Sequence, residues 1–289
     1  MRKFLGCLMA ACLLPLTAYA QEATIKEVHD KPAVRGSIIA NMLQEHDNPF
    51  TLYPYESNYV VYSVTDDLNK EAISSYNWSD NARKDEVKFQ LSLAFPLWRG
   101  ILGQNSVLGA SYTQKSWWQL SNSGESSPFR ETNYEPQVFL GFATDDTFAG
   151  WTLRDVEFGY NHQSNGRSDP TSRSWNRMYA RLMAEHGNWL VEVKPWYVIG
   201  STDDNSDITK YMGYYQLKVG YALGDAILSM KGQYNWNTGY GGAELGFSYP
   251  VGKHVRLYTQ LYSGYGESLI DYNFNQTRFG VGVMLNDLF

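Results

Sequence analysis

Residues 86–95 read EVKFQLSLAF, so apolar and polar side chains alternate along this stretch. The apolar positions are Val87, Phe89, Leu91, Leu93 and Phe95, and the polar positions between them are Lys88, Gln90 and Ser92. Successive side chains of a β-strand point to opposite faces. The pattern therefore predicts a strand with one apolar face and one polar face.

The same period-two pattern recurs along most of the chain. Twelve segments show it: 57–65, 86–95, 107–120, 135–144, 152–164, 173–185, 188–199, 209–223, 225–236, 242–250, 254–265 and 275–288. Most of them are longer than the roughly 5–6 residues usual for the strands of soluble proteins. They match the roughly 9–11 residues that a tilted strand needs to cross a membrane.

Two architectures produce such strands, and the length separates them. A soluble sandwich buries its apolar faces, whereas a transmembrane barrel turns them toward lipid around a polar interior. The 22 Tyr and 9 Trp, many near segment ends, are typical of the aromatic girdles of membrane barrels. We therefore expect an all-β, twelve-stranded antiparallel transmembrane β-barrel. Phe289 follows the last segment directly, and this aromatic-terminated strand resembles the assembly signal of outer-membrane proteins, which indicates the bacterial outer membrane.

The N-terminus predicts export. Residues 1–20 combine Arg2 and Lys3, an apolar core and an Ala-Tyr-Ala cleavage motif, the pattern of a secretory signal peptide. A lipoprotein signal ending at Cys12 is the alternative, but the apolar region before Cys12 would then be unusually short. Cleavage after Ala20 removes both cysteines, which excludes disulfides and thiol chemistry. It also changes the net charge from −6 to −8, so a basic nucleic-acid surface is absent.

The connections between the segments alternate in length. Short turns are expected at 145–151, 186–187, 224 and 251–253, and longer polar loops at 121–134, 165–172, 200–208, 237–241 and 266–274. This is the arrangement of periplasmic turns and external loops in membrane barrels. Residues 21–56 lack a strand pattern, and we interpret them as a periplasmic or entry segment with a short helix near 37–44. Residues 21–289 are expected to form one barrel domain.

Polar residues on the lipid-facing side are costly and therefore indicate function. His162 and Ser164 continue the apolar face of segment 152–164, and Asn176 lies on the corresponding face of the next segment. If Ser164 lies opposite Ser174, then His162 lies opposite Asn176. This arrangement predicts a nucleophile, a general base and an orienting amide. The alternative is that these residues only mark the polar rim where strand becomes loop.

Two stretches carry a resemblance to a known family. Residues 160–170, YNHQSNGRSDP, and residues 112–119, YTQKSWWQ, resemble segments of the outer-membrane phospholipase A family. The resemblance implies a calcium-dependent phospholipase acting on phospholipids and lysophospholipids, with Ser164 as nucleophile, His162 as base and Asn176 as third member. Gln163 departs from the family pattern, in which an acid is expected. Because Gln163 points inward, we expect it to affect hydrogen bonding inside the barrel.

The resemblance also implies where calcium binds and that the active form is a homodimer. The carried-over ligands are the Arg167 carbonyl and the Ser172 hydroxyl, with the Ser126 carbonyl supplied by the second subunit. Asp169 and Asp204 match a further site associated with the monomer. Carbonyl, hydroxyl and carboxylate oxygens are suitable calcium ligands.

The expected dimer contact lies on the lipid-facing side. Gln114 shares a face with Leu108 and Tyr112, and a lipid-facing amide can pair with its own copy across a two-fold axis. Leu91, Leu93 and Leu285 lie on lipid faces of neighbouring strands and are candidates for the apolar part of the contact. Ordinary contact with lipid explains these leucines equally well.

Two other functions are compatible with a barrel. A passive channel would have an open lumen, but the inward positions carry charges of both signs, which favours a barrel filled by ion pairs. These positions are Lys88, Arg177, Arg181, Glu192, Lys194, Lys218, Glu244 and Arg256. A structural or adhesin barrel has no specific support in the sequence.

Overall fold

The computed structural model describes residues 37–44 and 51–286. The predicted signal peptide, residues 1–20, and the terminal Phe289 lie outside the described residues. The strands are β1 Tyr53–Pro54, β2 Asn58–Thr65, β3 Asp85–Arg99, β4 Ser106–Trp118, β5 Phe129–Ala143, β6 Thr147–Phe148, β7 Trp151–Ser164, β8 Ser174–His186, β9 Trp189–Ile199, β10 Tyr215–Leu223, β11 Ala226–Asn235, β12 Tyr240–Pro250, β13 Arg256–Gly264 and β14 Gln276–Asn286. The helices are α1 Ile38–Leu43 and α2 Ile208–Met212, with single 3-10 turns η2 Ser79–Asn81, η3 Ser123–Glu125 and η4 Asp203–Asn205.

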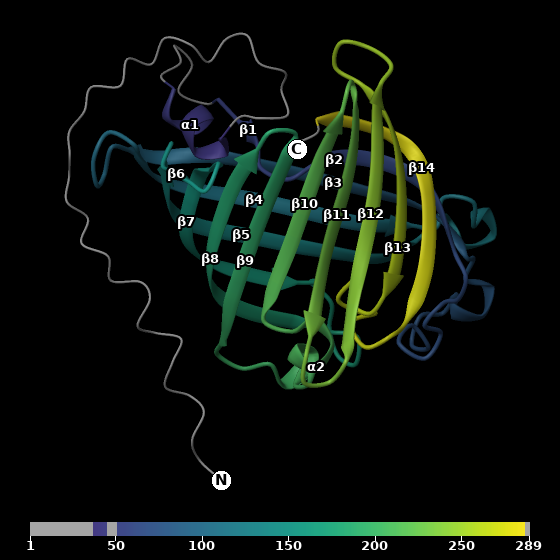
Figure 1. Ribbon diagram of the computed structural model, residues 1–289. Helices are drawn as coiled ribbons and strands as arrows, with labels where there is room; N and C mark the ends of the chain where they lie inside the picture. Colours follow the sequence, from purple (N-terminus) through teal and green to yellow (C-terminus); the bar gives the residue numbers. More distant parts are fainter. Residues whose placement is uncertain (1–36, 45–50, 287–289) are drawn as a thin grey trace. The chain divides into compact units, whose positions relative to one another are not determined.

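The sheet closes on itself. Of its 14 strands, β1 and β6 have only 2 residues each, and the other twelve are antiparallel neighbours. β14 pairs with β2, where Val281 faces Tyr62, and this pairing joins the end of the barrel to its beginning. Figure 1 shows the strands curving into the barrel wall. The expected twelve-stranded antiparallel barrel is confirmed. Across the described residues, no helix is long and apolar enough to cross a membrane.

Two of the predicted boundaries are wrong because contacts distant in sequence decide them. The strand predicted over 209–223 begins only at Tyr215, since Ile208–Met212 form α2. Asn235 Nδ2 donates to the Thr209 carbonyl, and the Tyr211 ring stacks on Tyr240, so the turn of helix is held by neighbouring strands. The loop expected at 121–134 ends earlier, because β5 already begins at Phe129.

The prediction of a longer loop at 237–241 is also wrong, because the connection is a short turn. β11 ends at Asn235 and β12 begins at Tyr240, which leaves only residues 236–239 between them. The Gly239 amide donates to the Asn235 carbonyl over 2.8 Å, and Gly239 adopts a positive φ of 75°. This tight turn lets β12 begin two residues earlier than the predicted segment 242–250, because glycine tolerates this backbone conformation.

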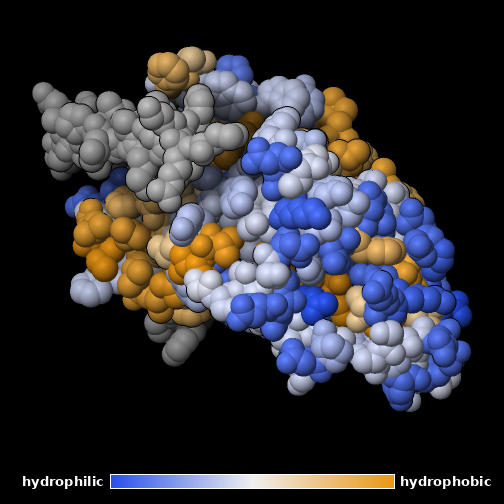
Figure 2. Space-filling view, turned by 90° about the horizontal axis from the view of Figure 1, so that it is seen from below, coloured by the Kyte–Doolittle hydropathy of each residue, from blue (hydrophilic) through white to orange (hydrophobic). Residues whose placement is uncertain are grey.

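The outer wall is apolar. Large apolar side chains project from it around the barrel, for example Val60 at 49%, Leu91 at 47%, Phe158 at 53% and Leu245 at 51% exposure. Figure 2 views the molecule from below, where hydrophilic residues cover much of the face and hydrophobic residues gather toward its sides. An exposed apolar wall is what a lipid-facing barrel requires.

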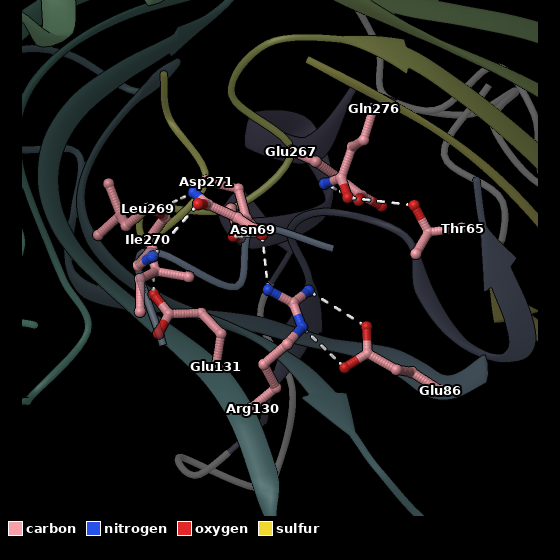
Figure 3. Close-up of polar contacts among 12 residues, drawn as sticks. Thr65, Asn69, Glu86, Arg130, Glu131, Glu267, Leu269, Ile270, Asp271 and Gln276 are labelled. Atoms are coloured by element: carbon pink, nitrogen blue, oxygen red, sulfur yellow. Dashed lines mark hydrogen bonds and ion pairs between the residues drawn. The ribbon is translucent and has the colours of Figure 1, made fainter. Parts of the chain in front are cut away.

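The interior is polar and densely paired. Arg130 lies between Glu86 and Asp271, with Nε 2.8 Å from Glu86 Oε1 and Nη1 2.6 Å from Asp271 Oδ2 (Figure 3). Seven of the inward charges predicted from sequence are buried: Lys88, Arg177, Arg181, Glu192, Lys194, Lys218 and Glu244. Arg256 is only partly buried and donates to Ser248 near the barrel end.

Segments outside the main strands close the interior near both ends. The predicted short helix is present as α1, and the Ile38 amide donates to Asp155 Oδ2 over 2.9 Å. Ile39 of α1 is fully buried against Gly141, where a Cβ would come within 2.4 Å of its side chain. The β13–β14 loop is buried as well, and its Leu269 amide donates to Asn133 Oδ1 on β5. In Figure 1, α1 and α2 lie at opposite ends of the barrel.

Candidate active site

The candidate site lies on the outer wall where β7 ends and β8 begins. The two strands pair in the register predicted from the sequence, with Ser164 facing Ser174 and His162 facing Asn176. Facing residues in an antiparallel pair have Cβ atoms about 4.5–5.5 Å apart. The pairing therefore brings the imidazole and the amide within reach of each other on one face.

The His162 ring is joined directly to Asn176. Nδ1 of His162 lies 2.8 Å from Asn176 Oδ1. With the amide oxygen facing the ring, Nδ1 carries the proton and Nε2 keeps its lone pair. Tyr160, two residues earlier on β7, donates its hydroxyl to the same Oδ1 over 2.7 Å. Asn176 therefore accepts two hydrogen bonds on one oxygen.

Ser164 is the last residue of β7 and is partly buried. It continues the face of Tyr160 and His162 at intervals of two residues, so its hydroxyl lies on the same side of the wall. Among the described residues, no hydrogen bond joins Ser164 Oγ to His162. Such bonds between nucleophile and base are often long in ligand-free enzymes and tighten when substrate binds.

The inner side of the same strands is closely packed. Trp175 is fully buried and donates Nε1 to Gln163 Oε1 over 2.7 Å. The Arg177 guanidinium stacks on the Trp175 ring at 4.0 Å, and Trp196 meets Trp175 edge to face. Gln163 thus points inward, as the alternation predicted, and its partners are interior side chains.

The loop after Ser164 is organised by Asn165, which is buried. Its Oδ1 accepts the Arg173 amide over 3.0 Å, and its Nδ2 donates to the Thr171 carbonyl over 2.8 Å. The Arg167 guanidinium lies over the Tyr76 ring at 4.6 Å, which connects this loop to the β2–β3 loop. Burial raises the pKa of Tyr76 to about 12, so the phenol stays protonated at neutral pH.

The structure brings together two of the predicted calcium ligands. Ser172 Oγ donates to Asp204 Oδ2 over 2.6 Å, which joins the β7–β8 loop to the β9–β10 loop. Asp169 is exposed in the same loop as Ser172. Ser126 is exposed in the β4–β5 loop, and within the described residues no hydrogen bond connects it to Arg167, Ser172 or Asp204. Within residues 37–44 and 51–286, no group of three or more His, Cys, Asp or Glu side chains is arranged so that it could hold a metal ion.

The predicted dimer residues lie on contiguous strands of the outer wall. Leu91 on β3 faces Gln114 on β4, and Leu93 faces Tyr112. Leu285 is 62% exposed on β14, separated from β3 only by β2. Gln114 already has partners within the chain, because Oε1 accepts from Tyr112 and Nε2 donates to Ser116 over 3.2 Å.

Sequence reasoning missed Tyr160 and Asn165 as parts of this site. The alternation puts Tyr160 on the lipid-facing side with His162, and their spacing of two residues was a signal that their side chains are neighbours. Asn165 gave no such signal, because its bonds to Thr171 and Arg173 depend on the path of the loop.

Fold and site together define a transmembrane β-barrel with a serine, histidine and asparagine on its lipid-facing wall. The family model described as Phospholipase A1 matches residues 37–285. Phospholipase A1 of Salmonella typhimurium is 86% identical over 289 residues, covering 100% of both chains. The chain therefore belongs to the outer-membrane phospholipase A family, also described as phospholipase A1, and is an outer-membrane barrel.

Two solved structures are similar over the barrel. One is outer membrane phospholipase A from Escherichia coli carrying an asparagine-to-alanine active-site mutation, with 87% identity and a TM-score of 0.87. It covers 89% of this chain and 100% of that chain. The other is the Salmonella typhi outer membrane phospholipase dimer with bound calcium, with 88% identity, a TM-score of 0.87 and the same coverage.

Proposed function

We propose that this chain is a calcium-dependent serine hydrolase that cleaves the acyl esters of phospholipids and lysophospholipids in the outer membrane. The observation that carries the proposal is the hydrogen bond of 2.8 Å between His162 and Asn176, beside Ser164 on the lipid-facing wall. The Salmonella relative is named phospholipase A1, and the Escherichia coli mutant has an active-site asparagine replaced. Both support the same assignment.

The geometry suits acyl transfer. Nε2 of His162 takes the proton from Ser164 Oγ as the oxygen attacks the ester carbonyl, and then returns it to the departing alcohol. The acyl group remains on Ser164 until water, activated by the same imidazole, releases it as a fatty acid. Asn176 holds Nδ1–H and so keeps Nε2 available as the base. A neutral amide avoids placing a further charge on an apolar surface.

The oxygen groups near Ser164 fit a calcium ion. The Arg167 carbonyl and the Ser172 hydroxyl are in the loop that follows the nucleophile, and Asp204 lies within hydrogen-bond distance of Ser172. All are hard oxygen donors of the kind calcium prefers. Asp169 is proposed to act with Asp204 in the monomer. When bound, calcium would stabilise the negative charge that develops on the ester carbonyl oxygen.

We further propose that the active form is a homodimer formed through Gln114, Leu91, Leu93 and Leu285. These residues lie on the contiguous strands β14, β3 and β4, with β2 between the first two. Ser126 of the partner would complete the calcium site with its carbonyl. Its left-handed backbone, with φ of 58°, is unusual for a residue with a side chain. The dimer with calcium described for Salmonella typhi supports this proposal.

A passive channel receives less support. The interior is crossed by ion pairs, including Lys88 to Glu267 at 3.0 Å, and the loop that carries Glu267 is buried within the barrel. A cavity inside has a volume of only about 90 Å³. Few solutes would pass such an interior without breaking buried charge pairs.

The deciding experiment compares two serine variants of the purified, refolded protein. Ser164→Ala should reduce phospholipid hydrolysis with calcium by at least about a thousandfold, because the nucleophile is lost. Ser263→Ala changes an exposed serine on β13 and should retain full activity. Hydrolysis by Ser164→Ala at the unaltered rate would refute the nucleophile assignment, and ion conductance without hydrolysis would favour the channel.

A further inference from the structure

Tyr160 occupies an unusual position for a lipid-facing tyrosine. Its side chain is on the outer wall of β7 and is 40% exposed, yet its hydroxyl points along the strand to Asn176 Oδ1 at 2.7 Å. The strand register places Tyr160 opposite Met178, so it meets Asn176 diagonally. Long aromatic side chains reach such diagonal neighbours.

Asn176 has little else to hold it in place. Beyond the two bonds to Oδ1, the described residues offer Nδ2 no hydrogen-bond partner. Nδ2 faces Gly200, which has no side chain and follows the end of β9; a Cβ there would lie 3.6 Å away. The amide of an asparagine is nearly symmetric in shape, so packing alone does not distinguish its two orientations.

The orientation of that amide matters for the proposed chemistry. With Oδ1 toward His162, Nδ1 carries the proton and Nε2 is free to accept one from Ser164. With Nδ2 there instead, Nδ1 becomes an acceptor and the proton moves to Nε2, which then cannot act as base. An aspartate in this position would have two equivalent oxygens and no such problem.

We propose that Tyr160 is a positioning residue that keeps Asn176 oriented for catalysis. The inference rests on the proposed function of the Ser164, His162 and Asn176 group. The hydroxyl supplies a second donor to Oδ1, and in the reversed orientation its proton would face lipid without an acceptor. An unsatisfied donor in an apolar environment is costly. Tyr160 therefore favours the orientation that leaves Nε2 free.

The test is Tyr160→Phe, which keeps the ring and removes only the hydroxyl. We expect kcat to fall about three- to tenfold, as one hydrogen bond is lost, with KM changed less than twofold. Sulfonylation of Ser164 by a long-chain alkylsulfonyl fluoride should slow by the same factor. Tyr249→Phe, on the lipid-facing side of β12 with 47% exposure, is the matched control and should behave as wild type.

A double-mutant cycle shows whether Tyr160 acts through Asn176. In the Asn176→Ala background, Tyr160→Phe should cause no further loss, because the amide it positions is absent. The same loss in both backgrounds, a rise in KM alone, or wild-type kcat for Tyr160→Phe would overturn the inference.

The same set of variants separates this inference from the proposed function. If Ser164→Ala retains wild-type kcat, the proposed function fails. If Ser164→Ala is impaired and Asn176→Ala is not, the orienting role of Asn176 fails and the role of Tyr160 fails with it. If both are impaired and Tyr160→Phe is not, only the role of Tyr160 fails. Heat-dependent mobility on SDS gels confirms in each case that the barrel is folded.

Discussion

Gln114 and Ser164 lie in one row of paired residues across the outer wall. Gln114 faces Tyr134 across β4 and β5, and Tyr134 faces Ser164 across β5 and β7. Neighbouring strands are about 4.8 Å apart, so two strand spacings separate the two residues by about 10 Å. A partner subunit seated on Gln114 would therefore lie beside the proposed nucleophile, where it can contribute to substrate binding.

Gln114→Ala should weaken the dimer. Polar contacts between membrane segments contribute about 0.6–2 kcal/mol, which corresponds to a dimer dissociation constant about three- to thirtyfold larger. The loss is moderate because Gln114 exchanges its contacts with Tyr112 and Ser116 for those of the partner. Sedimentation equilibrium in detergent with calcium measures the change. Thr259→Ala, on the wall of β13, serves as control, and equal association of all three proteins would remove the role of Gln114.

Asn176→Ala should lower kcat less than Ser164→Ala does. Without Oδ1 the imidazole loses its orienting partner but keeps its basic nitrogen, so we expect a loss of about 10- to 100-fold. Initial rates on a short-chain phospholipid give the comparison. A loss as large as that of Ser164→Ala would mean that the amide contributes more than orientation.

Ser172→Ala should raise the calcium concentration required for half-maximal activity by about tenfold, since one oxygen ligand is removed. The maximal rate at saturating calcium should change much less. Ser168→Ala is the control, because Ser168 is exposed in the same loop. Titration of activity with calcium after removal by a chelator separates the two variants, and overlapping curves would contradict the assignment of Ser172.

Arg130→Leu should destabilise the barrel strongly. It leaves Glu86 and Asp271 buried without their cation, although Arg278 still contacts Glu86 at 2.9 Å. Breaking a buried pair in this way costs about 3–5 kcal/mol. Unfolding by urea in lipid vesicles measures the change in free energy. Lys84→Ala disrupts the exposed pair with Asp67 and should cost less than about 1 kcal/mol; equal losses would show that burial does not matter here.

The alternation of side chains predicted more of the active site than hydropathy alone would suggest. It assigned His162, Ser164 and Asn176 to one face. Pairing Ser164 with Ser174 across the β7–β8 loop then predicted that His162 lies opposite Asn176. The structure has this pairing. The prediction succeeded because a hairpin constrains register locally.

Contacts between distant segments could not be predicted in this way. The bond of Ser172 to Asp204 depends on how two external loops fold toward each other, and the Arg130 to Asp271 pair depends on a loop that enters the barrel. For the same reason, the sequence pattern predicted a strand where the structure has the helix α2. In each case the partners are far apart in sequence, and no local pattern relates them.

The sequence by itself determined the closed barrel, its lipid-facing side and the face that carries Ser164, because side-chain direction in a strand follows from backbone geometry alone. Only the tertiary structure decided that Tyr160 and His162 share Asn176 Oδ1, and that Arg130 is buried between Glu86 and Asp271. These contacts depend on register, rotamers and loop paths. Such features are set by packing among residues that the chain brings together only when it folds.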